Sequence, residues 1–271
     1  MSKTRISERF NQLRAKGEAG LVAYVTAGDP TVELTPEVVW ALERGGADVI
    51  ELGVPFSDPI ADGPVIQLGM ARALKNGTNV TKVLAIARRI REKSQIPIML
   101  FSYMNPLLSY GWERLAADAR DAGIDGCLLT DLSVEEAAGP VKALRAAGLD
   151  TVFLGAPTST PERLKLVAGY SSGFVYLVSR TGVTGERDTL SDAVGPLVAA
   201  MRKVTDLPLA VGFGISKAAD AAAVAAVADA VVVGSAFVRL IEQNATSPEL
   251  FGKLEAAARE FKQGALSAKK I

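Results

Sequence analysis

The chain has 271 residues, of which 49% are hydrophobic, and its 30 basic residues balance 30 acidic ones. This length suits one large domain such as an α/β barrel, or two small domains, and the composition supplies an ample core. The net charge is zero, so the chain has no excess of basic residues to attract nucleic acid or an anionic membrane surface. We therefore expect neither as a partner.

The absence of histidine and the presence of a single cysteine narrow the chemistry that the chain can perform. The chain has no histidine, which excludes histidine-ligated metals, imidazole bases and Ser/His/Asp triads. Its single cysteine, Cys127, lies in an apolar run, so we expect no intrachain disulfide and interpret the thiol as buried. The charged N-terminus lacks an apolar signal segment, and no stretch approaches the roughly 18 apolar residues of a membrane span. We therefore expect a cytoplasmic protein without a metal site.

Short runs rich in Val, Ile, Leu and Phe recur along the chain, each followed by a segment with helical periodicity. Their near-continuous apolar character is typical of parallel strands covered on both faces. Residues 6–16 predict an extra helix that caps the bottom of a barrel, and residues 248–263 predict a closing helix. The predicted strands cover residues 20–25, 47–53, 96–103, 126–131, 151–156, 174–179, 207–214 and 230–235.

Eight β/α units in a chain of this length predict a (β/α)8 TIM barrel, with residues 1–271 forming one domain. A doubly wound open sheet is the alternative, but it usually has fewer strands, and no Gly-x-Gly-x-x-Gly motif follows the first strand. Two Thr-Pro pairs, at Thr35 and Thr160, each predict a helix N-cap followed by proline in the first turn. Ser133 and Glu136 predict a capping box.

Three carboxylates gather around the end of the second predicted strand. Glu51 lies near the strand end, and Asp58 and Asp62 follow in a proline-rich loop. In TIM barrels the active site lies at the C-terminal ends of the strands. Alternation along the strand puts Ile50 and Leu52 on one side and Glu51 on the other. A glutamate that faced the apolar interior would have a raised pKa and could act as both acid and base. Alternatively, Glu51 points outward to a lysine and the aspartates cap turns.

Glycines follow the last two predicted strands, in VGFGIS at 211–216 and VGSA at 233–236. Such turns let backbone N–H groups at helix N-termini cradle a phosphate, although tight turns use glycine anyway. The polar loop at 179–189 suits either a lid over the substrate or a plain flexible loop. No predicted strand contains a lysine, which disfavours Schiff-base aldolase chemistry. Any C–C cleavage should then use acid–base catalysis, with the substrate as its own electron sink.

The chain closely resembles the tryptophan synthase alpha subunit family. The segment ELGVPFSDPIADGP at 51–64 matches the family signature almost letter for letter. The other matches follow in order and span nearly the whole chain: VTAGDP at 25–30, YMNP at 103–106, Asp131 with Glu135 and Glu136, APT at 156–158, YLVSRTGVTG at 176–185, GFGIS at 212–216 and GSA at 234–236.

This resemblance implies a cofactor-free lyase that cleaves indole-3-glycerol phosphate to indole and D-glyceraldehyde 3-phosphate. Carried over by position, Glu51 would protonate indole C3 and later take the proton of the glycerol hydroxyl next to the breaking bond. Asp62 would hold the indole N–H and stabilise its positive charge. The other residues implied are Tyr176 near the glycerol, Thr184 as a lid residue that bonds Asp62, Tyr24 and Phe101 as walls for the indole ring, and Gly185, Phe213, Gly214, Gly234 and Ser235 for phosphate.

The resemblance also implies a partner, the PLP-dependent beta subunit, in an alpha-beta-beta-alpha complex that channels indole. The contact surface would include the loop after the second strand, in which Asp58 would have a structural role. Ser133 stands where the family usually has proline, and we expect the fold to tolerate it. Two alternatives stay open: a stand-alone indole-releasing lyase, and an inactive barrel that activates a beta subunit allosterically. Intact Glu51 and Asp62 argue against the inactive barrel.

Overall fold

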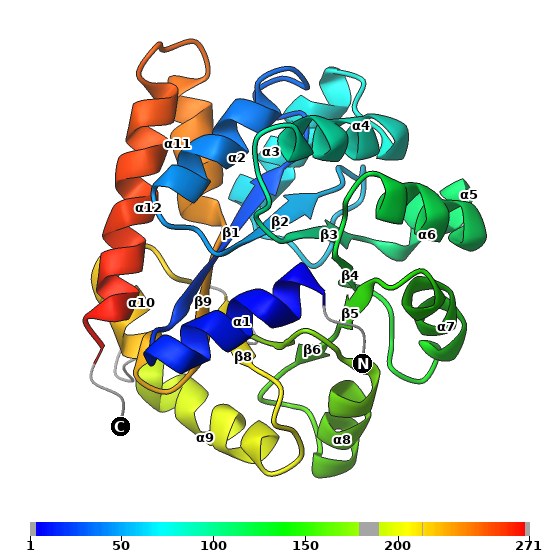
Figure 1. Cartoon of the computed structure of the whole chain (residues 1–271), viewed down its shortest axis with the longest axis vertical. Coiled ribbons are helices and arrows are strands. Elements are labelled where there is room, and N and C mark those ends of the chain that lie inside the picture. Colours follow the sequence, from blue (N-terminus) through cyan, green and yellow to red (C-terminus); the bar gives the residue numbers. More distant parts are fainter. Residues whose placement is uncertain (1–3, 179–189, 213, 269–271) are drawn as a thin grey trace.

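A computed structural model describes residues 4–178, 190–212 and 214–268, and Figure 1 shows a ring of strands surrounded by helices. The strand order is β5-β4-β3-β2-β1-β9-β8-β7-β6, and every described pair is parallel. The strands are β1 Gly20–Thr26, β2 Val49–Gly53, β3 Ile98–Ser102, β4 Gly126–Leu129, β5 Asp150–Val152, β6 Leu154–Gly155, β7 Val175–Val178, β8 Leu209–Gly212 and β9 Ala230–Val233.

The predicted TIM barrel is confirmed, with one difference in the strand count. The fifth predicted strand is split at Phe153 into β5, which pairs with β4, and β6, which pairs with β7. This short chain segment therefore joins the two ends of the ring.

The helices are α1 Arg5–Lys16, α2 Thr35–Arg44, α3 Pro64–Lys75, α4 Val80–Arg91, α5 Met104–Tyr110, α6 Trp112–Asp121, α7 Ala138–Ala146, α8 Pro161–Tyr170, α9 Leu190–Arg202, α10 Ala218–Ala225, α11 Ser235–Asn244 and α12 Leu250–Leu266.

One of the three predicted helix starts is confirmed. The Thr160 hydroxyl caps α8 by accepting the N–H of Arg163. Thr35 is already the first residue of α2, because its hydroxyl donates to the carbonyl of Thr31 instead of capping. The capping box at Ser133 is wrong: residues 134–137 form a turn, and α7 begins only at Ala138.

Side chains of the strands alternate between two apolar layers. On β2, Ile50 and Leu52 pack outward in the core between barrel and helices, whereas Val49 packs in the barrel interior. Glu51 lies between the two outward residues, so it faces the interior with Val49. The alternation predicted for the second strand thus fixes the direction of the glutamate.

The predicted N-terminal helix closes the bottom of the barrel, where Figure 1 shows α1 lying across the strands. Ile6, Phe10 and Leu13 recur at the spacing of one helix face and join the apolar cluster of the barrel interior. The Phe10 ring lies 5.4 Å from the ring of Phe174, just before β7. Apolar side chains of α1 therefore fill this end of the barrel interior.

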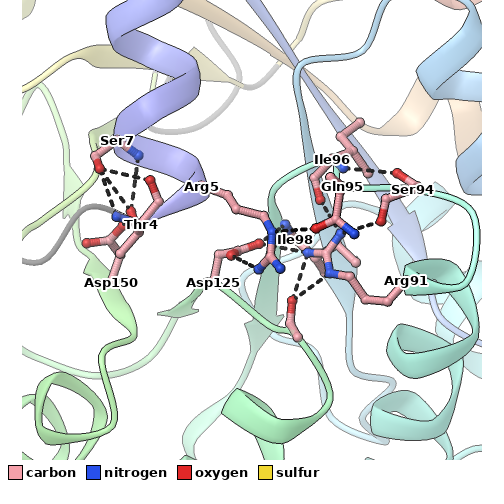
Figure 2. Close-up of polar contacts among 11 residues, drawn as sticks. Thr4, Arg5, Ser7, Arg91, Ser94, Gln95, Ile96, Ile98, Asp125 and Asp150 are labelled. Atoms are coloured by element: carbon pink, nitrogen blue, oxygen red, sulfur yellow. Dashed lines mark hydrogen bonds and ion pairs between the residues drawn. The ribbon is translucent and has the colours of Figure 1, made fainter.

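A buried carboxylate anchors the same end of the barrel, as Figure 2 shows. Asp125 precedes β4 and accepts the N–H of Ile98, at the start of β3, at 2.8 Å. It also pairs with Arg5 of α1 and Arg91 of α4, each at 2.8 Å. Burial lowers the pKa of Arg91 to about 10, because removal of the guanidinium from water disfavours its charged form. One aspartate therefore ties a strand and two helices together.

We expect Asp125→Ala to reduce the free energy of unfolding by about 3–5 kcal/mol, because it leaves the buried Arg91 charge without its partner. Urea unfolding measures this change. The control is Asp121→Ala, which breaks an exposed pair with Arg120 and should cost less than about 1 kcal/mol. Equal losses in the two variants would contradict this account of the barrel bottom.

Candidate active site

A cavity of about 310 Å³ opens at the C-terminal ends of the strands, opposite α1. It collects side chains from the ends of β1, β2, β3 and β7, from the loop after β2, and from the start of α11. Every candidate site residue that the structure describes lies in its lining: Tyr24, Glu51, Asp62, Phe101, Tyr176, Gly214, Gly234 and Ser235. The predicted residues Thr184, Gly185 and Phe213, and the candidate lid at 179–189, lie outside the described residues.

Glu51 is the most unusual residue of this cavity. It is 1% exposed, and among the described residues no hydrogen-bond donor reaches its Oε1 atom. Burial, with a smaller contribution from the charge of Asp62, raises its pKa from the ordinary value of 4.5 to about 8. The carboxyl group is therefore protonated at neutral pH and can act as a proton donor.

Asp62 is held in place by a tyrosine. The Tyr103 hydroxyl donates to Asp62 Oδ2 at 2.6 Å and accepts the backbone N–H of Ala61 at 3.0 Å. Burial raises the pKa of Asp62, and the bond from Tyr103 opposes that rise. The loop after β2 is thus attached to the end of β3, with the Asp62 carboxylate turned toward the cavity.

Tyr103 was not among the predicted site residues. It follows β3, two positions after Phe101, and a two-residue period puts both side chains on the interior face. This spacing from Phe101 could have identified Tyr103 as a residue of the interior face. Its bond to Asp62 joins residues 41 positions apart, which the alternation alone does not reveal.

Two tyrosines fit against glycines of neighbouring strands. A Cβ atom at Gly53 would lie 2.3 Å from the Tyr24 hydroxyl oxygen, and one at Gly212 would lie 2.0 Å from that of Tyr176. Any side chain at these positions would therefore displace a ring. Tyr24 also packs edge-on against Phe101, with 5.1 Å between ring centroids. Tyr24 and Phe101 therefore form an aromatic wall of the cavity that Glu51 also lines, a surface suited to an aromatic ring.

The far end of the cavity is formed by the start of α11. Gly234 is the N-cap residue of this helix and Ser235 its first residue, so the first N–H groups of the helix have no partner within it. Gly214, with φ of 81°, turns the chain after β8 in a conformation that favours glycine. Free N–H groups and the positive end of the helix dipole are suited to bind an anion.

Asp58 lies apart from this cavity. It is exposed, its nearest polar contact is the neighbouring Ser57 hydroxyl, and its carbonyl accepts the N–H of Ile60 at 2.9 Å. Asp58 is therefore not part of the cavity lining, and its structural role stays a prediction. Ile60, at the tip of the same loop, is 86% exposed.

Fold and site together define an enzyme of the TIM-barrel class, with a carboxylate pair at the C-terminal face of the barrel. The family model of the tryptophan synthase alpha chain matches residues 10–266. The chain therefore belongs to the tryptophan synthase alpha chain family. It is a lyase, and its activity is the alpha reaction of tryptophan biosynthesis.

Individual relatives support the same assignment. The tryptophan synthase alpha chain of Solibacter usitatus is 63% identical over 261 residues, covering 96% of this chain and 98% of that protein. The alpha chain of Methanosarcina mazei is 48% identical over 269 residues, covering 99% and 97%. Among solved structures, Mycobacterium tuberculosis tryptophan synthase superposes with a TM-score of 0.89 at 37% identity, covering 98% of this chain and 99% of that chain. No helix in the described parts of the chain is long and apolar enough to cross a membrane.

Proposed function

We propose that the chain cleaves indole-3-glycerol phosphate to indole and D-glyceraldehyde 3-phosphate by carboxylate acid–base catalysis. The observation that carries this proposal is Glu51, a buried carboxyl group without a hydrogen-bond donor at Oε1 and with a pKa of about 8, facing the substrate cavity. A protonated carboxyl of this kind can deliver a proton to a weakly basic carbon such as indole C3.

The reaction divides between the two carboxylates. Glu51 donates its proton to C3, and the indole becomes an indolenium whose positive charge the Asp62 carboxylate stabilises at the ring nitrogen. The Glu51 carboxylate then takes the proton of the glycerol hydroxyl next to the bond to C3. As that hydroxyl becomes a carbonyl, the C–C bond breaks, its electron pair returns to the indolenium, and indole and glyceraldehyde 3-phosphate leave.

The other lining residues fit the two halves of this substrate. Tyr24 and Phe101 form the wall for the indole ring, Tyr176 lies beside the glycerol, and the start of α11 takes the phosphate. No cofactor enters these steps, because the indolenium itself is the electron sink. Thr184, Gly185 and Phe213 are assigned here only by family resemblance.

The proposed partner is the PLP-dependent beta subunit, in an alpha-beta-beta-alpha complex in the cytoplasm. The loop that carries Asp62 also presents Ile60, an 86% exposed apolar side chain, on the outer surface. A partner that covered Ile60 would contact the same loop as the catalytic aspartate. Partner binding and catalysis would thereby be coupled.

An indole-release assay on the pure chain, with and without a beta subunit, tests this proposal. We expect slow cleavage by the chain alone and faster cleavage after the beta subunit is added. Fast turnover that the beta subunit does not change would favour a stand-alone lyase. No indole release under either condition would contradict the proposal and favour an inactive barrel.

A further inference from the structure

One charged residue of the cavity has no part in the chemistry described so far. Arg239 lies in the second turn of α11 and is the only cationic side chain among the described residues that line the cavity. The two carboxyl groups of the lining, Glu51 and Asp62, come from β2 and from the loop after it. The cavity therefore has an acidic end at β2 and a basic residue at α11.

Arg239 has no acidic partner among the described residues. Glu242, three positions further along the same helix, would be its natural neighbour. That carboxylate is instead bound by Arg72 of α3 at 2.8 Å, and Arg72 also pairs with the buried Asp29. The guanidinium of Arg239 is thus left available for a ligand in the cavity.

The position of Arg239 on α11 directs it toward the start of the helix. It follows Ser235 by four residues, so both lie on one helix face, and side chains in helices lean toward the N-terminus. Both residues line the cavity, together with Gly234. A group bound at the free N–H groups of α11 is therefore within reach of the Arg239 guanidinium.

An independent observation shows that this cavity is built for a ligand. The buried Oε1 atom of Glu51, which has no donor among the described residues, belongs to a side chain of the same lining. Leaving such an atom without a donor is unfavourable, and this pattern is typical of functional sites. An anionic ligand would meet the Asp62 carboxylate at one end and would be drawn to the opposite end by Arg239.

We infer that Arg239 recognises the phosphate dianion of the substrate and sets its orientation in the cavity. This inference rests on the proposed function, because it assigns the residue to the phosphate of the same substrate. Arg239 contributes binding that is equal in the ground state and the transition state, so it acts on KM and leaves kcat almost unchanged.

Binding to the full-length chain tests this role without catalysis, with glycerol 3-phosphate as the phosphate probe and indole as the neutral probe. We expect Arg239→Gln to weaken glycerol 3-phosphate binding roughly tenfold and to leave indole binding unchanged. Arg239→Lys should retain most of the affinity, because it keeps the charge. The matched control is Arg88→Gln, an exposed position on α4 outside the cavity lining, which should bind both probes like the wild type.

Kinetics provide a second readout. Arg239→Gln should raise KM for indole-3-glycerol phosphate roughly tenfold, with kcat within about twofold of wild type, and the difference should shrink at high salt. Unchanged glycerol 3-phosphate binding in Arg239→Gln would overturn the inference, and so would an equal loss of indole binding, which indicates a structural role. Failure of the proposed function is a different result: the wild type would release no indole.

Discussion

Replacing Glu51 by glutamine is expected to lower the rate of indole release by about 10³-fold or more. Glutamine has nearly the same shape, but it can neither donate a proton to C3 nor accept one from the glycerol hydroxyl. Glu51 is 1% exposed and lines the cavity, and a glutamine of the same shape leaves that lining unchanged. The variant should therefore keep its affinity for indole and for glycerol 3-phosphate. Steady-state turnover and calorimetric binding measure the two effects separately.

The stability of this variant is its internal control. The pKa of Glu51 is about 8 in the folded chain against 4.5 in an unfolded one, so folding is penalised once the unfolded state ionises. Wild-type stability should fall, relative to Glu51→Gln, as the pH rises from 4.5 to 8. A variant that is stable at neutral pH yet inactive fits this expectation. Turnover within tenfold of wild type would contradict the assigned role.

Replacing Asp62 by asparagine should also lower turnover, by about 10²–10³-fold. The asparagine carbonyl can still accept the Tyr103 hydroxyl, so the loop keeps its attachment to β3 while the negative charge is lost. The charge matters most when the indole nitrogen becomes positive, and the loss should therefore appear in kcat. Turnover of the isolated chain measures this effect.

Asp58→Asn is the matched control for this experiment. It makes the same chemical change in the same loop, but Asp58 is exposed and absent from the cavity lining. In the isolated chain its turnover should stay within about twofold of wild type. Equal losses in the two variants would show that any charge in the loop matters, and would contradict a specific role for Asp62.

The sequence predicted well those features that depend on local patterns. Alternation along β2 placed Glu51 opposite Ile50 and Leu52, and the structure has this arrangement. Apolar runs located each strand that the structure describes, because parallel strands covered on both faces consist mainly of apolar residues. The split of the fifth strand at Phe153 escaped prediction, because it depends on pairing with β4 on one side and β7 on the other.

Features that depend on distant contacts could not be predicted. Tyr103 belongs to a segment that matches the family, but its bond to Asp62 exists only after β3 and the loop after β2 meet. Arg239 has no acidic partner among residues 4–178, 190–212 and 214–268, and Glu242, the acid beside it, is bound by Arg72 from another helix. The helix start expected at Ser133 was wrong because a turn with a backbone bond from Glu136 to Ser133 replaces the first helical turn.

The pH dependence of kcat/KM for the pure chain tests the central claim most directly, because this quantity reports the ionisation of groups in the free enzyme. The claim is that a protonated Glu51, with a pKa of about 8, delivers the proton to the indole ring. The account predicts that kcat/KM falls about tenfold per pH unit above about pH 8. A kcat/KM that stays constant or rises between about pH 8 and 10 would contradict it.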